Sequence, residues 1–181
     1  MSSRDQYEPG AASGATIEKD GDKWTLVLVR ELRHSPARVW QAITDPEELR
    51  EWAPFDSDRN LGTVGPATLS TVGAPAPQVS ESRIKRADAP RTLEYSWGAQ
   101  DIRWELEPRG GGTRLTLWHN IDRRYIAMGA AGWHICFDVM ERHLAGESIG
   151  RIVGPEVMKF GGWQRLHAEY AKQFGIEGRS Q

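Results

Sequence analysis

Side chains that could do chemistry gather in one short stretch, "AAGWHICFDVMERHLAGE" at 130–147. It contains His134, Asp138, Glu141 and His143, together with the only cysteine of the protein. Imidazole and carboxylate groups at close spacing can act as a general acid–base pair or can ligate a metal ion. The stretch is therefore either a catalytic cluster or a helix whose polar residues fall on different sides.

Helical geometry favours the second interpretation. At about 100° per residue, His134 and Asp138 share one flank, where they can pair, and Glu141 lies on that flank two turns further on. His143 points nearly opposite, so we expect no metal site. Cys136 borders the apolar side, where a small buried thiol is the commoner role. A half-exposed flank with a local His–Asp contact is favoured, because structural charge pairs are commoner than catalytic ones.

His119 is a second candidate, at the end of the segment "TRLTLWHN". It shares the inward face of that segment with Leu115 and Leu117, because side chains alternate between the two faces of a strand. An inward imidazole here either touches a ligand or is a buried rim residue bonded to a carbonyl, and the second is favoured. Trp118 faces the opposite way and is expected to be exposed or to contact a partner.

The segments before the histidines predict a strand, two short helices and a series of strands. Residues 24–34 are rich in β-branched residues and form the first strand. Ser35 and Asp45, each followed by proline, are typical N-caps of short helices. Residues 56–121 alternate between apolar and polar side chains, with a hairpin turn at the Gly110 to Gly112 run.

Helical spacing returns in the last third of the chain. Residues 125–145 place Trp133, Phe137, Met140 and Leu144 on one apolar stripe, which predicts a long helix. A last helix is expected from about 162 to 174. A single antiparallel sheet with one apolar face must bury that face, and only the long helix is long enough to cover it.

Composition limits the class of protein. The net charge of −2 without a basic block argues against nucleic-acid binding. A single cysteine, no apolar run of membrane-spanning length and no signal peptide favour a cytoplasmic protein that does not enter a membrane. We expect a disordered segment at 1–22, one domain at 23–175 and a tail at 176–181.

Two segments resemble a known family. "SPARVWQAITDPEELREW" (35–52) is similar to the early signature of the SRPBCC, or START-like, superfamily. "GWHICFDVMERHLAGE" (132–147) resembles the late segment of its branch named Activator of Hsp90 ATPase homologue-like. The resemblance covers roughly 23–175, and two separated motifs in the right order are more specific than either alone.

The resemblance implies an α+β helix-grip fold, in which a curved antiparallel sheet wraps around a long C-terminal helix. The two short helices follow the first strand, and one extra helix ends the chain. Members of the superfamily often have a hydrophobic cavity between sheet and helix, where they bind lipids, polyketides or hormones. Some are cyclases or hydrolases, so the family shares a fold more than a function.

Three functions remain open. The leading hypothesis is a carrier or sensor that binds a small apolar or amphipathic molecule in that cavity. The second is a cyclase- or hydrolase-type enzyme with His119 or His134 as base and Glu141 as partner. The third is a protein-interaction or chaperone-associated module that uses Trp118. We expect no metal or cofactor, and a homodimer is the oligomer considered. The residues expected to contact the ligand are Tyr95, Trp97, Trp104, His119, Trp133, His134, Phe137, Met140 and Glu141. For the aromatic residues Tyr95, Trp97, Trp104, Trp133 and Phe137, a filled core is an equally good interpretation.

Overall fold

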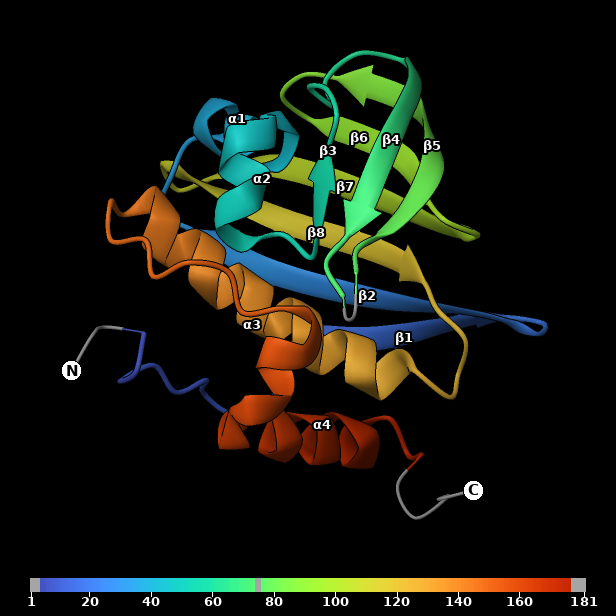
Figure 1. The fold of residues 1–181 in the computed structure, drawn as a ribbon, viewed down its shortest axis with the longest axis vertical. Coiled ribbons are helices and arrows are strands. Elements are labelled where there is room, and N and C mark those ends of the chain that lie inside the picture. The colour runs from blue at the N-terminus through green and yellow to red at the C-terminus, as the bar shows by residue number, and fades with distance from the viewer. Residues whose placement is uncertain (1–3, 74–75, 177–181) are drawn as a thin grey trace.

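The computed structural model describes residues 4–73 and 76–176. One eight-stranded antiparallel sheet, in the order β1-β2-β8-β7-β6-β5-β4-β3, curls around a long helix (Figure 1). The strands are β1 (Ala15–Asp20), β2 (Lys23–Leu32), β3 (Phe55–Ser57), β4 (Gly65–Thr71), β5 (Gln78–Asp88), β6 (Thr92–Trp97), β7 (Gln100–Arg109) and β8 (Gly112–Asn120).

The helices lie on one side of this sheet and at one of its ends. They are α1 (Pro36–Thr44), α2 (Pro46–Trp52), α3 (Ile126–Leu144), a 3₁₀ helix η1 (Gly154–Lys159) and α4 (Gly161–Gln173). Helix α3 runs along the sheet, and α4 packs against the far side of α3 (Figure 1). The predicted α+β helix-grip fold is confirmed. None of the helices in the described ranges is long and apolar enough to cross a membrane.

Local sequence explains where the two short helices begin. The Ser35 side chain accepts a hydrogen bond from the Arg38 N–H at 3.2 Å, and proline follows it at the first helical position. The Asp45 carboxylate likewise accepts a hydrogen bond from the Glu47 N–H at 2.8 Å. Each cap satisfies a backbone donor that the first helical turn leaves free, as the sequence predicts.

Two tight hairpins set the register of β6, β7 and β8. Gly110 and Gly111 both have positive φ, which a two-residue turn between β7 and β8 requires. In the β6–β7 hairpin, Gly98 takes the positive φ at the first turn position, as in a type II′ turn. This second turn pairs Trp97 directly with Gln100 across the two strands.

The apolar face of the sheet packs on α3. Leu26, Leu117 and Trp104 come from neighbouring strands, and each is 0% exposed. They meet the predicted stripe of α3, of which Phe137 and Met140 are no more than 1% exposed. Burying large apolar side chains on both surfaces is the main term that stabilises this arrangement.

The N-terminal segment differs from the prediction of disorder over 1–22. Residues 15–20 form β1, which pairs with the edge of β2, and residues before it run past α3 and α4 (Figure 1). The edge of β2 offers free backbone groups, and Tyr7 adds a buried aromatic ring that is 5% exposed. Pairing and docking thus order a segment whose own sequence has little apolar content. The predicted tail at 176–181 lies outside the described residues, apart from Ile176.

Candidate functional site

An apolar pocket of about 270 Å³ lies where the β6–β7 hairpin meets α3 and the segment before η1. Trp97 comes from β6, Trp133 and Cys136 come from α3, and Ile152 and Val153 come from the connecting segment. None of the side chains that line it carries a charge at neutral pH. This wall favours apolar, uncharged molecules, since burying an unpaired charge is costly.

Two glycines of α3 shape this pocket in different ways. A Cβ atom built on Gly132 would meet nothing within 4 Å, so the missing side chain leaves open space. A Cβ atom on Gly129 would lie 2.6 Å from the Ile121 side chain, so that position is already filled. Both glycines line the pocket, but only Gly132 faces free volume.

Three polar side chains of the pocket, those of Trp133, His119 and Gln100, form a hydrogen-bonded chain. The indole N–H of Trp133 donates to Nδ1 of His119 at 2.9 Å. Nε2 of His119 lies 2.6 Å from Oε1 of Gln100. An indole nitrogen can only donate, so Nδ1 must accept, and the proton of the neutral imidazole must be on Nε2. His119 therefore donates to the Gln100 oxygen.

Burial keeps this imidazole neutral. His119 is 3% exposed, and desolvation lowers its pKa to about 3. Its ring also lies against Trp97, with the ring centroids 5.4 Å apart. Because Trp133 uses the lone pair of Nδ1, no free lone pair is left to accept a proton from a substrate. The network thus disfavours the predicted role of His119 as a general base.

Cys136 is inert at neutral pH. Burial raises the pKa of its thiol to about 12, so the thiolate that a nucleophile needs is scarce. The residue lines the pocket as a small, apolar side chain, as the sequence predicts.

Four predicted ligand contacts lie in the packed core beside the pocket. Tyr95 and Trp104 are joined by a hydrogen bond of 3.1 Å, and Trp104 packs on the ring of Phe137. Met140 is 0% exposed. None of the four lines the pocket. Large side chains therefore fill most of the space between sheet and helix, and the open volume is confined to one end.

His134 and Glu141 lie on another flank of α3, away from the pocket. His134 is 4% exposed, so the predicted half-exposed flank is wrong there, because α4 covers it. Its Nδ1 is 2.7 Å from the Tyr170 hydroxyl, and its Nε2 is 3.6 Å from Asp138. Desolvation lowers the pKa of His134. The structure brings Trp97, His119 and Trp133 together at the pocket but leaves His134 and Glu141 outside it.

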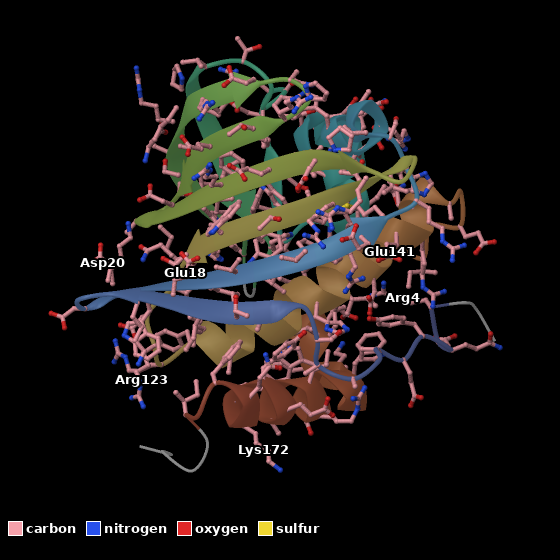
Figure 2. All side chains as sticks on the ribbon, turned by 180° about the vertical axis from the view of Figure 1, so that it is seen from behind. Arg4, Glu18, Asp20, Arg123, Glu141 and Lys172 are labelled. Carbon is pink, nitrogen blue, oxygen red and sulfur yellow. The ribbon has the colours of Figure 1, made fainter. Side chains whose placement is uncertain are left out.

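Glu141 belongs to an ionic cluster that anchors the N-terminal segment. One nitrogen of Arg30 lies 2.7 Å from carboxylate oxygens of both Asp138 and Glu141. The buried Tyr7 hydroxyl donates to the other oxygen of Asp138. Figure 2 shows Glu141 on the side of the molecule where the N-terminal segment, marked by Arg4, passes α3. These contacts indicate a structural role for the cluster.

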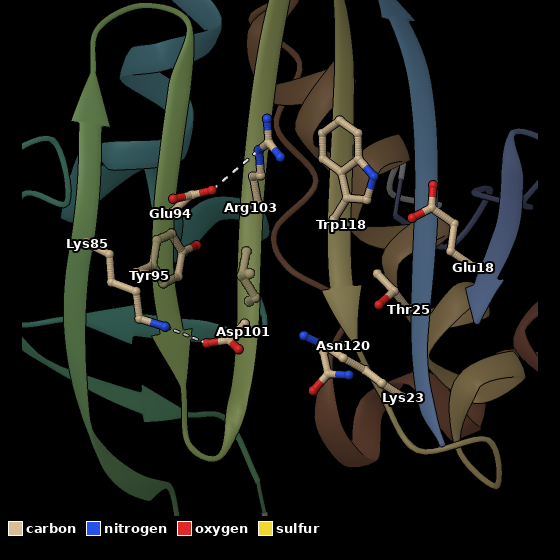
Figure 3. A pocket seen from close by; sticks show the side chains of 11 residues that line it. Glu18, Lys23, Thr25, Lys85, Glu94, Tyr95, Asp101, Arg103, Trp118 and Asn120 are labelled. Carbon is tan, nitrogen blue, oxygen red and sulfur yellow. Dashed lines mark hydrogen bonds and ion pairs between the residues drawn. The ribbon is translucent and has the colours of Figure 1, made fainter. Parts of the chain in front are cut away.

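A second groove, of about 350 Å³, lies on the outer face of the sheet (Figure 3). Its charged side chains largely pair with one another: Lys85 with Asp101 at 2.7 Å, and Arg103 with Glu94 at 3.5 Å. The Arg103 guanidinium also lies over the ring of Trp118, 5.0 Å from its centroid. Trp118, expected to be exposed or to contact a partner, is half-buried. This groove lacks the apolar walls of the first pocket.

The curled sheet around α3, with an apolar pocket at one end, defines a helix-grip protein. The family model described as Activator of Hsp90 ATPase homolog 1-like protein matches residues 33–145, which is more than half of the chain. The chain belongs to this family, as its two sequence segments predict, and hence to the SRPBCC superfamily.

Solved structures share the fold at low sequence identity. The chain is similar to EF2215, a conserved protein of unknown function from Enterococcus faecalis, at 15% identity and a TM-score of 0.68, over 91% of this chain and 92% of that one. CalU16 from Micromonospora echinospora is 20% identical at a TM-score of 0.61, over 88% and 93% of the two chains. An AHSA1-like protein from Aeromonas hydrophila is 18% identical at 0.56, over 69% and 96%. No protein of curated function matches the chain. These likenesses establish the fold alone.

Proposed function

We propose that this protein binds a small apolar molecule in the pocket between the β6–β7 hairpin and α3, as a carrier or sensor. The observation that carries the proposal is the open space beside Gly132, in a pocket of about 270 Å³ whose lining side chains are uncharged. Concave pockets with mostly apolar walls and an opening to solvent are typical ligand sites.

The volume limits the size of the ligand. Typical ligand pockets measure about 300–1,000 Å³, so this one, at about 270 Å³, lies just below that range. An engineered apolar cavity of about 150 Å³ binds benzene. By that standard, 270 Å³ suits a molecule of about two fused rings rather than a long lipid.

The rim of the pocket is apolar as well. Tyr125 is 51% exposed and Met128 is 42% exposed, and both line the pocket at the start of α3. Large apolar side chains are normally buried, and a group of them around an opening is typical of a binding site. We infer that the ligand enters past these two residues.

The test is the binding of tetralin, an uncharged bicyclic hydrocarbon, followed by ¹⁵N–¹H NMR on the full chain. We expect saturable shifts of the Trp97 and Trp133 indole resonances. Gly132→Leu fills the open space without a clash of its first carbon and should abolish the shifts.

The matched control is Gly161→Leu, at the start of α4, where an added Cβ also meets nothing within 4 Å. This variant should bind tetralin as the wild type does. The proposal fails if tetralin does not bind to the wild type, or if both leucine variants bind it equally well.

A further inference from the structure

The Gln100 side chain has a hydrogen-bonding capacity that the described residues do not use. Its Oε1 accepts from His119, but its amide nitrogen, which has two N–H donors, bonds to none of the described residues. Gln100 is half-buried and lines the apolar pocket. An acceptor atom of a bound ligand can form a hydrogen bond with this unused donor, and that bond stabilises the complex.

The directions of the two hydrogen bonds at His119 fix the orientation of the Gln100 amide. The Trp133 indole can only donate, which makes Nδ1 of His119 the acceptor and places the proton on Nε2. That proton requires an acceptor, so Gln100 must turn its oxygen toward His119. The NH₂ group is then the end of Gln100 that remains for a ligand.

The two indole donors of the pocket already have hydrogen-bond partners. The Trp97 indole N–H donates to the Thr71 hydroxyl at 2.7 Å, and the Trp133 indole donates to His119. The Cys136 thiol is at most a weak donor. The Tyr125 hydroxyl also has no hydrogen-bond partner among the described residues, but it lies at the rim, where the residue is 51% exposed. Gln100, at the β6–β7 turn, is thus the free strong donor among the half-buried side chains that line the pocket.

We propose that the ligand is uncharged and carries one oxygen acceptor of the carbonyl type, which the Gln100 NH₂ group binds. This inference rests on the proposed function, since it assigns a chemical class to the molecule in the same pocket. The carbonyl oxygen satisfies a donor that a pure hydrocarbon would cover and leave unpaired. A carboxylate is disfavoured, because no lining side chain supplies a positive charge.

The test compares two probes of nearly equal shape, 1-tetralone and tetralin, which differ by one carbonyl group. Their dissociation constants are measured by NMR titration with the wild type, Gln100→Leu and Gln100→Glu. A neutral hydrogen bond corresponds to a factor of about 2 to 13 in affinity. We expect Gln100→Leu to weaken the binding of 1-tetralone by such a factor and to leave tetralin unchanged or slightly tighter.

Gln100→Glu keeps the shape of the side chain but removes its N–H donors. A carboxylate can still accept the His119 proton but has no N–H for the ligand, so 1-tetralone should again lose affinity. A second readout needs no ligand: the ¹⁵N shifts of His119 should report the Nε2–H tautomer in the wild type. An Nδ1–H tautomer would overturn the proposal, because the Gln100 amide would then point the other way.

The outcomes separate this inference from the proposed function. If both probes bind and each Gln100 variant changes their affinities by the same factor, or not at all, the inference is wrong and the pocket remains a binding site. If neither probe binds to the wild type, the proposed function fails and the inference fails with it.

Discussion

At the scale of single residues, His119 connects the core to the pocket. It is buried and neutral, it accepts from Trp133, and it donates to Gln100. The inward direction of His119 follows from strand alternation, and so it can be predicted from sequence. Its partners cannot, because Gln100 and Trp133 lie on other elements and meet it only in the folded chain.

Burial of His119 predicts a specific pH dependence. The pKa of His119 is about 3 in the folded protein and near 6.5 in the unfolded chain, so below pH 6.5 the unfolded chain binds a proton that the folded protein does not. Stability is therefore fully present above pH 6.5 and is lost as the pH falls toward 3. At about 1.4 kcal/mol per pH unit, the loss between pH 6.5 and 4 is roughly 3 kcal/mol.

The measurement is urea unfolding at several pH values for the wild type and His119→Gln. The rings and the amide that face His119, from Trp97, Trp133 and Gln100, do not titrate in this range. Other titrating groups, His134 among them, are present in both proteins, so the difference between the two curves isolates His119. Parallel curves between pH 7 and 4 would show that His119 is not buried as a neutral group.

At the scale of elements, the helix caps and the β7–β8 turn follow from local sequence. The N-terminal strand does not follow from its apolar content, although one local signal points to it. Gly21-Asp22 is a two-residue turn of the Gly-X kind, and Gly21 adopts a positive φ between β1 and β2. The docking of residues 4–14 depends on groups more than 100 positions away, such as Asp138. No pattern within the segment itself can reveal these partners.

The Tyr7 hydroxyl holds this segment to α3, which makes Tyr7→Phe informative. The change removes a hydrogen bond to a half-buried carboxylate, and bonds to charged groups contribute about 1.5–3 kcal/mol. Arg30 still pairs with Asp138, so we expect a loss of roughly 1–2 kcal/mol in the free energy of unfolding. Urea denaturation followed by tryptophan fluorescence measures this loss.

Tyr125→Phe is the matched control for that variant. Tyr125 is 51% exposed, and its hydroxyl forms no hydrogen bond with the residues that the structure describes. Its removal should change stability by less than about 0.5 kcal/mol. Equal losses in the two variants would mean that the contact between Tyr7 and Asp138 does not stabilise the fold.

At the scale of the whole molecule, the pocket beside α3 and the groove on the outer face of the sheet are opposite in character. The inner one is apolar and uncharged, whereas the outer one is lined by Lys85, Asp101, Arg103 and Glu94, which pair with one another. The family resemblance implies a cavity between sheet and helix, and the aromatic residues there could either line a pocket or form a filled core. In the structure Trp104 and Phe137 belong to the filled part, and Trp97 and Trp133 line the pocket. Residual volume depends on how side chains from several elements interlock, which periodicity does not encode.

The location of a bound molecule is the most direct test of this account. Intermolecular nuclear Overhauser effects between 1-tetralone and the isotope-labelled protein report which side chains it touches. We expect contacts to the Trp97 and Trp133 rings and to the Met128 methyl group, with the Gln100 amide resonances shifted. Contacts to Trp118 on the outer face, or no contacts at saturating 1-tetralone, would contradict this expectation.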